Sequence, residues 1–130
     1  MKGILLFAHG ASDPQWVEPF RRIQAEVLVA APALPVALAF LERSSPDFAG
    51  GVRELITRGC NEVVVFPLFL ARGGHLKQDL PELIARARIE HSGLLIRQTP
   101  ALGEVPEMLQ AIAGFILREV DRDPSSGNTP

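Results

Sequence analysis

Several features are scarce in this 130-residue chain, and each scarcity excludes a class of protein. Cys60 is the one cysteine, so no disulfide can form within the chain, and a reducing compartment, the cytoplasm, is the expected location. The net charge of −2 argues against a nucleic-acid-binding protein, which normally has a basic excess. No apolar run approaches the roughly 20 residues of a membrane span, and the run at residues 4–8 is too short for a signal peptide. We therefore expect neither nucleic acid nor a membrane as a partner.

The residues that are present suit one small globular domain. Apolar residues make up 47% of the chain, which is enough for a hydrophobic core, and charged residues make up 22%. We expect a single domain over residues 1–122. Residues 123–130 are dominated by Pro, Ser, Gly and Asn, a composition that predicts a disordered tail.

Four short apolar runs predict buried strands, because each run is continuous rather than alternating with polar residues. The runs are residues 4–8, 36–41, 62–69 and 94–98. Four amphipathic helices are predicted between and after them, since apolar residues recur there every three or four positions. Their apolar stripes are Val17, Phe20, Ile23 and Val27; Phe48, Val52, Leu55 and Ile56; Leu80, Leu83, Ile84 and Ala87; and Val105, Leu109, Ile112, Phe115 or Ile116, and Val120.

Polar residues, proline and glycine indicate where these helices begin and end. Ser12 or Asp13 is a suitable N-cap for the first helix, and Gly59 is placed to end the second. For the third helix we expect Asp79 as the N-cap, with Pro81 in the first turn.

Strict alternation of strands and helices predicts an α/β domain with a four-stranded parallel sheet between helical layers. The simplest flavodoxin-like arrangement has strand order 2-1-3-4. Ligands of such sheets bind beyond the carboxyl ends of the strands, at the point where the strand order reverses. That point lies between the first and third strands, so residues 9–12 and 71–79 are expected there, with residues 42–45 following the neighbouring second strand.

These segments carry side chains that suit a divalent metal. His9 and His75 each follow one of the two central strands, and Glu42 follows the second. Imidazoles and a carboxylate accept cobalt, iron or nickel, and so few protein ligands leave coordination positions open. Imidazole also takes up a proton near neutral pH. We therefore predict that His9, His75 and Glu42 are catalytic and that the two histidines bind the metal.

The same segments can accommodate a flat, anionic molecule. Gly73 and Gly74 lack side chains, so a planar ligand could lie against the backbone. Apolar contact would come from Leu70, Ala71 and Leu76, and anionic groups of the ligand would meet Arg43, Arg72 and Lys77.

Other notable residues have simpler interpretations. His91 should end the third helix at the far edge of the sheet, where it interacts with the helix dipole. Cys60 is expected to be buried and inert, and Trp16 to pack in the core or at an interface. The phosphate-binding patterns G-x-G-x-x-G and G-x-x-x-x-G-K-[ST] and the nucleophile elbow G-x-S-x-G are all missing from the sequence.

The motifs together resemble the CbiX-type sirohydrochlorin chelatases, which are class II tetrapyrrole chelatases, in their short form. The resemblance covers residues 1 to about 120 and rests on Leu-Leu-Phe-Ala-His-Gly at 5–10, Phe-Leu-Glu at 40–42, the segment 65–75 ending in Ala-Arg-Gly-Gly-His, and Asp-Leu-Pro at 79–81. It implies a chelatase-like three-layer fold and insertion of Co²⁺ or Fe²⁺ into sirohydrochlorin, in cobalamin or sirohaem biosynthesis. It also implies a homodimer, no permanently bound cofactor, and a divalent metal substrate, with Ni²⁺ as a further candidate.

The resemblance assigns roles to individual residues. His9 is implied to be a metal ligand and proton acceptor, and His75 the second metal ligand. The tetrapyrrole is implied to contact residues 42–45, which include Arg43 and Ser45, and residues 70–75 with Leu70, Ala71, Arg72, Gly73, Gly74 and His75. One departure is that Ala11 follows His9-Gly10 where the family more often has serine, so the hydroxyl moves to Ser12.

Two other functions compete with the chelatase. A non-catalytic carrier of metal or tetrapyrrole would need nearly the same residues. A flavodoxin-like nucleotide-binding or regulatory domain is disfavoured because the phosphate-binding patterns are missing.

Overall fold

The computed structural model describes residues 1–71 and 73–122, apart from the side chains of residues 74 and 75; the predicted tail, 123–130, lies outside the described residues. Four parallel strands form one sheet in the order β2-β1-β3-β4, which confirms the predicted topology. Their bounds are β1 Lys2–Ala8, β2 Val36–Phe40, β3 Glu62–Pro67 and β4 Leu95–Gln98.

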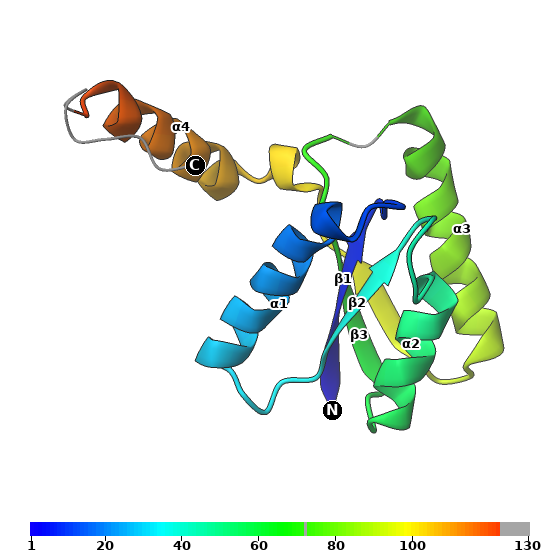
Figure 1. Cartoon of the computed structure of the whole chain (residues 1–130). Helices are drawn as coiled ribbons and strands as arrows, with labels where there is room; N and C mark the ends of the chain where they lie inside the picture. The colour runs from blue at the N-terminus through cyan, green and yellow to red at the C-terminus, as the bar shows by residue number, and fades with distance from the viewer. Residues whose placement is uncertain (72, 123–130) are drawn as a thin grey trace.

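Helices cover both faces of the sheet (Figure 1). On one face of the sheet α1 packs against β1 and β2. On the other face α2 packs against β1 and β2, and α3 packs against β4. The helix bounds are α1 Glu18–Ala30, α2 Phe48–Thr57, α3 Gly74–Glu90 and α4 Pro106–Val120, with short 3-10 turns η1 Pro14–Trp16 and η2 Leu102–Glu104. Within residues 1–71 and 73–122, no helix has the length and apolarity needed to cross a bilayer.

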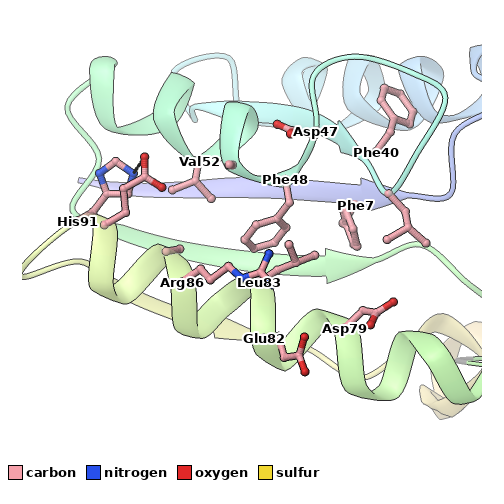
Figure 2. Close-up of a pocket in the computed structure, with 14 residues that line it drawn as sticks. Phe7, Phe40, Asp47, Phe48, Val52, Asp79, Glu82, Leu83, Arg86 and His91 are labelled. Carbon is pink, nitrogen blue, oxygen red and sulfur yellow. Dashed lines mark ion pairs between the residues drawn. The ribbon is translucent and has the colours of Figure 1, made fainter.

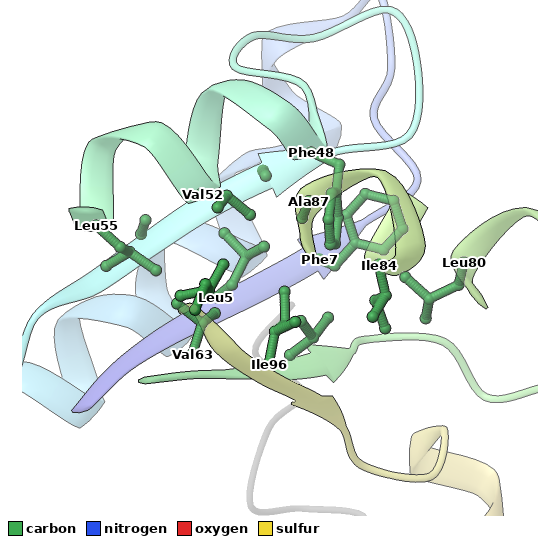
Figure 3. Packing of buried hydrophobic residues seen from close by; sticks show 14 of the residues in the cluster. Leu5, Phe7, Phe48, Val52, Leu55, Val63, Leu80, Ile84, Ala87 and Ile96 are labelled. Carbon is green, nitrogen blue, oxygen red and sulfur yellow. The ribbon is translucent and has the colours of Figure 1, made fainter. Parts of the chain in front are cut away.

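The larger core lies between the sheet and the α2–α3 layer (Figure 3). Leu5 and Phe7 of β1 are fully buried in it, because alternate residues of a strand point to the same face. The Phe7 ring meets Phe48 of α2 edge-on, with 5.4 Å between the ring centroids and 86° between their planes. It also meets Phe69 edge-on at 6.2 Å, so Phe7 links the sheet, α2 and the loop after β3.

Phe7→Ala is expected to lower the free energy of unfolding by about 3–5 kcal/mol, because it leaves a cavity under three packed elements. Urea denaturation followed by circular dichroism measures this change. Val29→Ala is the control, because Val29 is 78% exposed and its loss should cost less than about 0.5 kcal/mol. Equal stability of the two variants would show that Phe7 does not anchor the core.

Helix α3 begins earlier than its sequence pattern predicts. Its N-cap is Gly73, so the prediction that Asp79 is the N-cap is wrong, and Pro81 lies inside the helix rather than in its first turn. Leu76 and Leu80 are both buried and four residues apart, so they extend the apolar face one turn toward the N-terminus. This burial offsets the hydrogen bond that Pro81 cannot donate.

The other helix ends agree better with the sequence. Asp13 does act as a cap, accepting a hydrogen bond from the Gln15 amide, but it caps η1, and α1 begins only at Glu18. Gly59 follows α2 with φ of +96°, the left-handed conformation predicted for a glycine at that position. His91 is the C-cap residue of α3, as expected.

Helix α4 forms as predicted but does not cover the sheet. Its apolar stripe was expected to face a core, whereas none of its residues is buried. Figure 1 shows α4 extending away from the sheet and the other helices.

Candidate functional site

The candidate site lies at the carboxyl edge of the sheet, beyond the ends of β1, β2 and β3. His9 directly follows β1 and is exposed. Its ring meets the ring of Phe69 edge-on, with 5.2 Å between centroids and 80° between planes. Since Phe69 is only 8% exposed, it gives the imidazole a fixed support on one side while the rest of the ring is open to a ligand.

Gly10 brings the loop after β1 against the loop after β2. Its φ is +88°, and a Cβ at this position would lie 1.9 Å from the Glu42 carbonyl oxygen. The Glu42 amide donates to the His9 carbonyl at 3.1 Å, and the Leu41 amide donates to the Ala8 carbonyl at 2.9 Å. Glu42 is exposed like His9, so the His9 imidazole and the Glu42 carboxylate lie on two backbone segments that are hydrogen-bonded to each other.

Ser44 fastens the same two loops a second time. The Ala11 amide donates to Ser44 Oγ at 3.0 Å, and that hydroxyl donates to the Ala11 carbonyl at 2.9 Å. Between these bonds Arg43 adopts a φ of +62°, and both Arg43 and Ser45 are exposed. Sequence reasoning named Arg43 and Ser45 but missed Ser44, because nothing in the sequence distinguishes the two adjacent serines.

The loop after β3 forms the part of the site beyond the carboxyl end of that strand. Leu70 is 66% exposed, and Ala71 and Gly73 are exposed as well. A Cβ added at Gly73 would meet nothing within 4 Å, so packing within the chain does not require a glycine there. The backbone of Gly74 and His75 forms the first turn of α3 at this edge. Thus the segment that carries His75 follows β3, the strand that pairs with β1, and His9 follows β1.

Not every predicted residue can be located. Arg72 lies outside the described residues, as do the side chains of Gly74 and His75. Among the described side chains, which do not include that of His75, no three of His, Cys, Asp and Glu gather closely enough to hold a metal ion. The sharing of one metal by His9 and His75 therefore stays a prediction.

The turn η2 braces the loop after β3. The Leu102 amide donates to the Phe69 carbonyl at 2.8 Å, and a Cβ at Gly103 would lie only 1.7 Å from the Leu70 carbonyl oxygen. This contact was missed from the sequence, because a single glycine in a loop does not reveal which backbone approaches it. It connects the edge of the site to the start of α4.

Three residues outside the site behave largely as expected. Cys60 is buried, with 4% exposure, and His91 lies at the far end of α3, with Nε2 3.8 Å from Glu90 Oε1. Trp16 is 71% exposed in η1, so it does not pack in the core, and its packing at an interface stays a prediction. Its backbone completes a short turn capped by Asp13.

A cavity of about 350 Å³ lies between α2 and α3, on the face of the sheet that these two helices cover (Figure 2). Phe7, Phe48 and Leu83 provide apolar walls, and Asp79 and Arg86 are among the charged residues that line it. His9 and Glu42 do not line this cavity.

The fold and the site define a class of protein: a three-layer α/β domain with an open, histidine-bearing edge where the strand order reverses. Residues 3–117 match the CbiX family, and the chain belongs to that family. One relative, the sirohydrochlorin cobaltochelatase of Saccharolobus islandicus, is 37% identical over 84 residues. That alignment covers 65% of this chain and 64% of the relative, so the match spans less than two thirds of the relative's length.

Solved structures agree with this assignment. A CbiX protein from Marinobacter aquaeolei VT8, named for cobalamin (vitamin B12) biosynthesis, has 34% identity and a TM-score of 0.81, with 95% of this chain and 100% of that chain covered. The sirohydrochlorin chelatase SirB from Bacillus subtilis subspecies spizizenii, solved with cobalt, has 24% identity and a TM-score of 0.77. The match covers 90% of this chain and 50% of SirB, and at this identity it shows the shared fold.

Proposed function

We propose that this protein is a sirohydrochlorin chelatase that inserts a divalent metal, principally Co²⁺, into its tetrapyrrole substrate. The observation that carries the proposal is the edge at which the His9 and Glu42 backbones are hydrogen-bonded and the His75 segment follows the adjoining strand. The sirohydrochlorin cobaltochelatase name of the Saccharolobus islandicus relative supports the choice of substrate and metal.

In the proposed reaction the metal is a substrate and no permanently bound cofactor takes part. His9 and His75 hold the ion, and the Glu42 carboxylate and water complete its coordination. Few protein ligands favour transfer, because open coordination positions can accept the ring nitrogens while the protein ligands leave. Fe²⁺ and Ni²⁺ suit the same ligands, and insertion of iron would belong to sirohaem rather than cobalamin biosynthesis.

The ring lies across the loop after β3, where Leu70, Ala71, Gly73 and Gly74 present little side-chain bulk. Its peripheral carboxylates pair with Arg43 and Arg72, and Ser45 contributes a hydroxyl. As the metal bonds to the pyrrole nitrogens, two N–H protons leave the ring, and His9 and Glu42 are the bases that accept them. The charges balance, because a doubly charged cation replaces two protons.

Two further assignments belong to this proposal. We expect the protein to act in the cytoplasm, as its single cysteine indicates. We also expect a homodimer, because one strand-end edge forms a shallow shelf and a second copy can close over a flat substrate.

Purified protein mixed with sirohydrochlorin and Co²⁺ should insert the metal at least about 100-fold faster than the protein-free reaction, as measured by the change in ring absorbance. Parallel reactions with Fe²⁺ and Ni²⁺ should also run above their protein-free rates. Binding of both substrates without any acceleration would refute the chelatase proposal and favour the non-catalytic carrier.

A further inference from the structure

The His9 imidazole contacts an aromatic ring but has no hydrogen-bond partner among the described residues. A histidine that binds a metal normally donates its second ring N–H to a carboxylate, a backbone carbonyl or water, and this hydrogen bond fixes the direction of the ring. His9 is exposed, and an exposed side chain without such a partner exchanges rotamers within nanoseconds. If His9 is to bind a metal in one orientation, another contact has to hold its ring.

Phe69 makes that contact. The two ring centroids are 5.2 Å apart and the ring planes are inclined at 80°, which is the edge-on arrangement that aromatic pairs favour. Unlike a hydrogen bond, a contact of this kind does not require either imidazole nitrogen as a donor. Phe69 can therefore orient His9 while a nitrogen stays open to a metal ion or a proton.

Phe69 is itself held firmly enough to orient a neighbour. Its side chain is 8% exposed and meets the Phe7 ring edge-on, with 6.2 Å between centroids. The Phe69 carbonyl accepts a hydrogen bond from the Leu102 amide at 2.8 Å, and the preceding Leu68 amide donates to the Phe7 carbonyl at 2.8 Å. The Phe69 ring is thus fixed relative to β1, the strand that His9 follows.

The contact with His9 ends a row of phenyl rings that begins in the core. Phe48, at the start of α2, packs on Phe7 (Figure 3), and Phe7 packs on Phe69. Phe48 is 3% exposed, and its ring contact is with Phe7 rather than with Phe69 or His9. The row therefore contains a ring that supports His9 directly and a ring, equally buried, that does not.

We propose that Phe69 is the positioning residue of His9, and that its edge-on contact replaces the hydrogen bond that orients other metal-binding histidines. This assignment rests on the proposed function and extends it, because it gives a role to a residue that acts through His9. Loss of a hydrogen-bonded partner of a metal-binding histidine typically costs about 10- to 100-fold in metal affinity or activity. An aromatic pair is weaker, so about 3- to 10-fold is expected here.

NMR spectroscopy tests the contact without metal or substrate. Phe69→Leu keeps an apolar side chain but removes the ring, so the carbon-bound protons of the His9 imidazole should shift. The coupling constants between the α and β protons of His9 should change from the values of a single rotamer to averaged values. Phe69→Tyr keeps the ring and should retain the wild-type couplings. His9→Ala identifies the signals among those of the three histidines.

Cobalt binding and insertion test the consequence for function. In Phe69→Leu the Co²⁺ affinity, measured by calorimetry, and kcat for insertion should each fall about 3- to 10-fold, because the ligand is present but is no longer held in one orientation. The KM for sirohydrochlorin should not change. Phe69→Tyr should restore the Co²⁺ affinity.

Phe48→Leu is the matched control, since it removes a buried ring from the same row and leaves the pair of Phe69 and His9 in place. It should lower the thermal unfolding midpoint without changing the Co²⁺ affinity. Unchanged His9 couplings in Phe69→Leu, or an equal loss of Co²⁺ affinity in Phe48→Leu, would overturn the proposal. A wild-type protein that binds Co²⁺ without inserting it would refute the proposed function alone, because the couplings and affinities would still decide the role of Phe69.

Discussion

His9→Ala is expected to reduce cobalt insertion at least about 100-fold while leaving the fold intact, because in the proposed mechanism His9 is both a metal ligand and a proton acceptor. His9 is exposed, so its removal should change the free energy of unfolding by less than about 0.5 kcal/mol. His75→Ala should give a loss of the same size. Initial insertion rates at saturating sirohydrochlorin, with cobalt affinity measured by calorimetry, separate lost binding from slower chemistry.

The matched control is His91→Ala, which removes an imidazole from the opposite end of α3. Its insertion rate should equal that of the wild type. Full activity of both His9→Ala and His75→Ala would exclude the mechanism proposed above.

Gly10→Ala is expected to lower the free energy of unfolding by about 3 kcal/mol or more, and to abolish most insertion activity. The new Cβ would lie 1.9 Å from the Glu42 carbonyl oxygen, and φ of +88° disfavours any side chain. The two loops must separate, which breaks the hydrogen bond between Glu42 and His9. Urea denaturation and the insertion assay measure the two effects.

Gly73→Ala is the control for stability. Gly73 has φ of −67° and open space around the position of a Cβ, so alanine should cost less than about 1 kcal/mol. If Gly10→Ala were as stable as Gly73→Ala, the two loops would not be in the close contact described above.

The sheet could be predicted from sequence because its strands are buried on both faces. The runs at residues 4–8 and 62–69 are continuously apolar, and alternation with helices then leaves few possible topologies. The same reasoning placed His9 and Glu42 at one edge, since both directly follow strands. The start of α3 was misjudged because proline normally marks a first turn, whereas burial of Leu76 extends the helix past Pro81.

Contacts between distant loops were not predictable. Ser44 is important because it hydrogen-bonds to the Ala11 backbone, and Gly103 because it lies against the Leu70 backbone. Neither residue belongs to a periodic pattern or a motif that would have indicated these contacts. The exposure of the α4 side chains could not be predicted from the sequence for a related reason. An apolar stripe indicates that a helix face will be covered, but not whether the covering surface belongs to the same chain.

The open position of His9 affects how the protein can discriminate between metals. His9 is exposed, so under the proposed mechanism a metal ion that it binds would exchange freely with the surrounding solution. Such a site has no filter based on ion size, and intrinsic affinity alone would rank nickel above cobalt and iron. The identity of the inserted metal would then follow the free metal concentrations that the cell maintains. The metallated tetrapyrrole could leave through the same open edge of the sheet by which the metal and the ring entered.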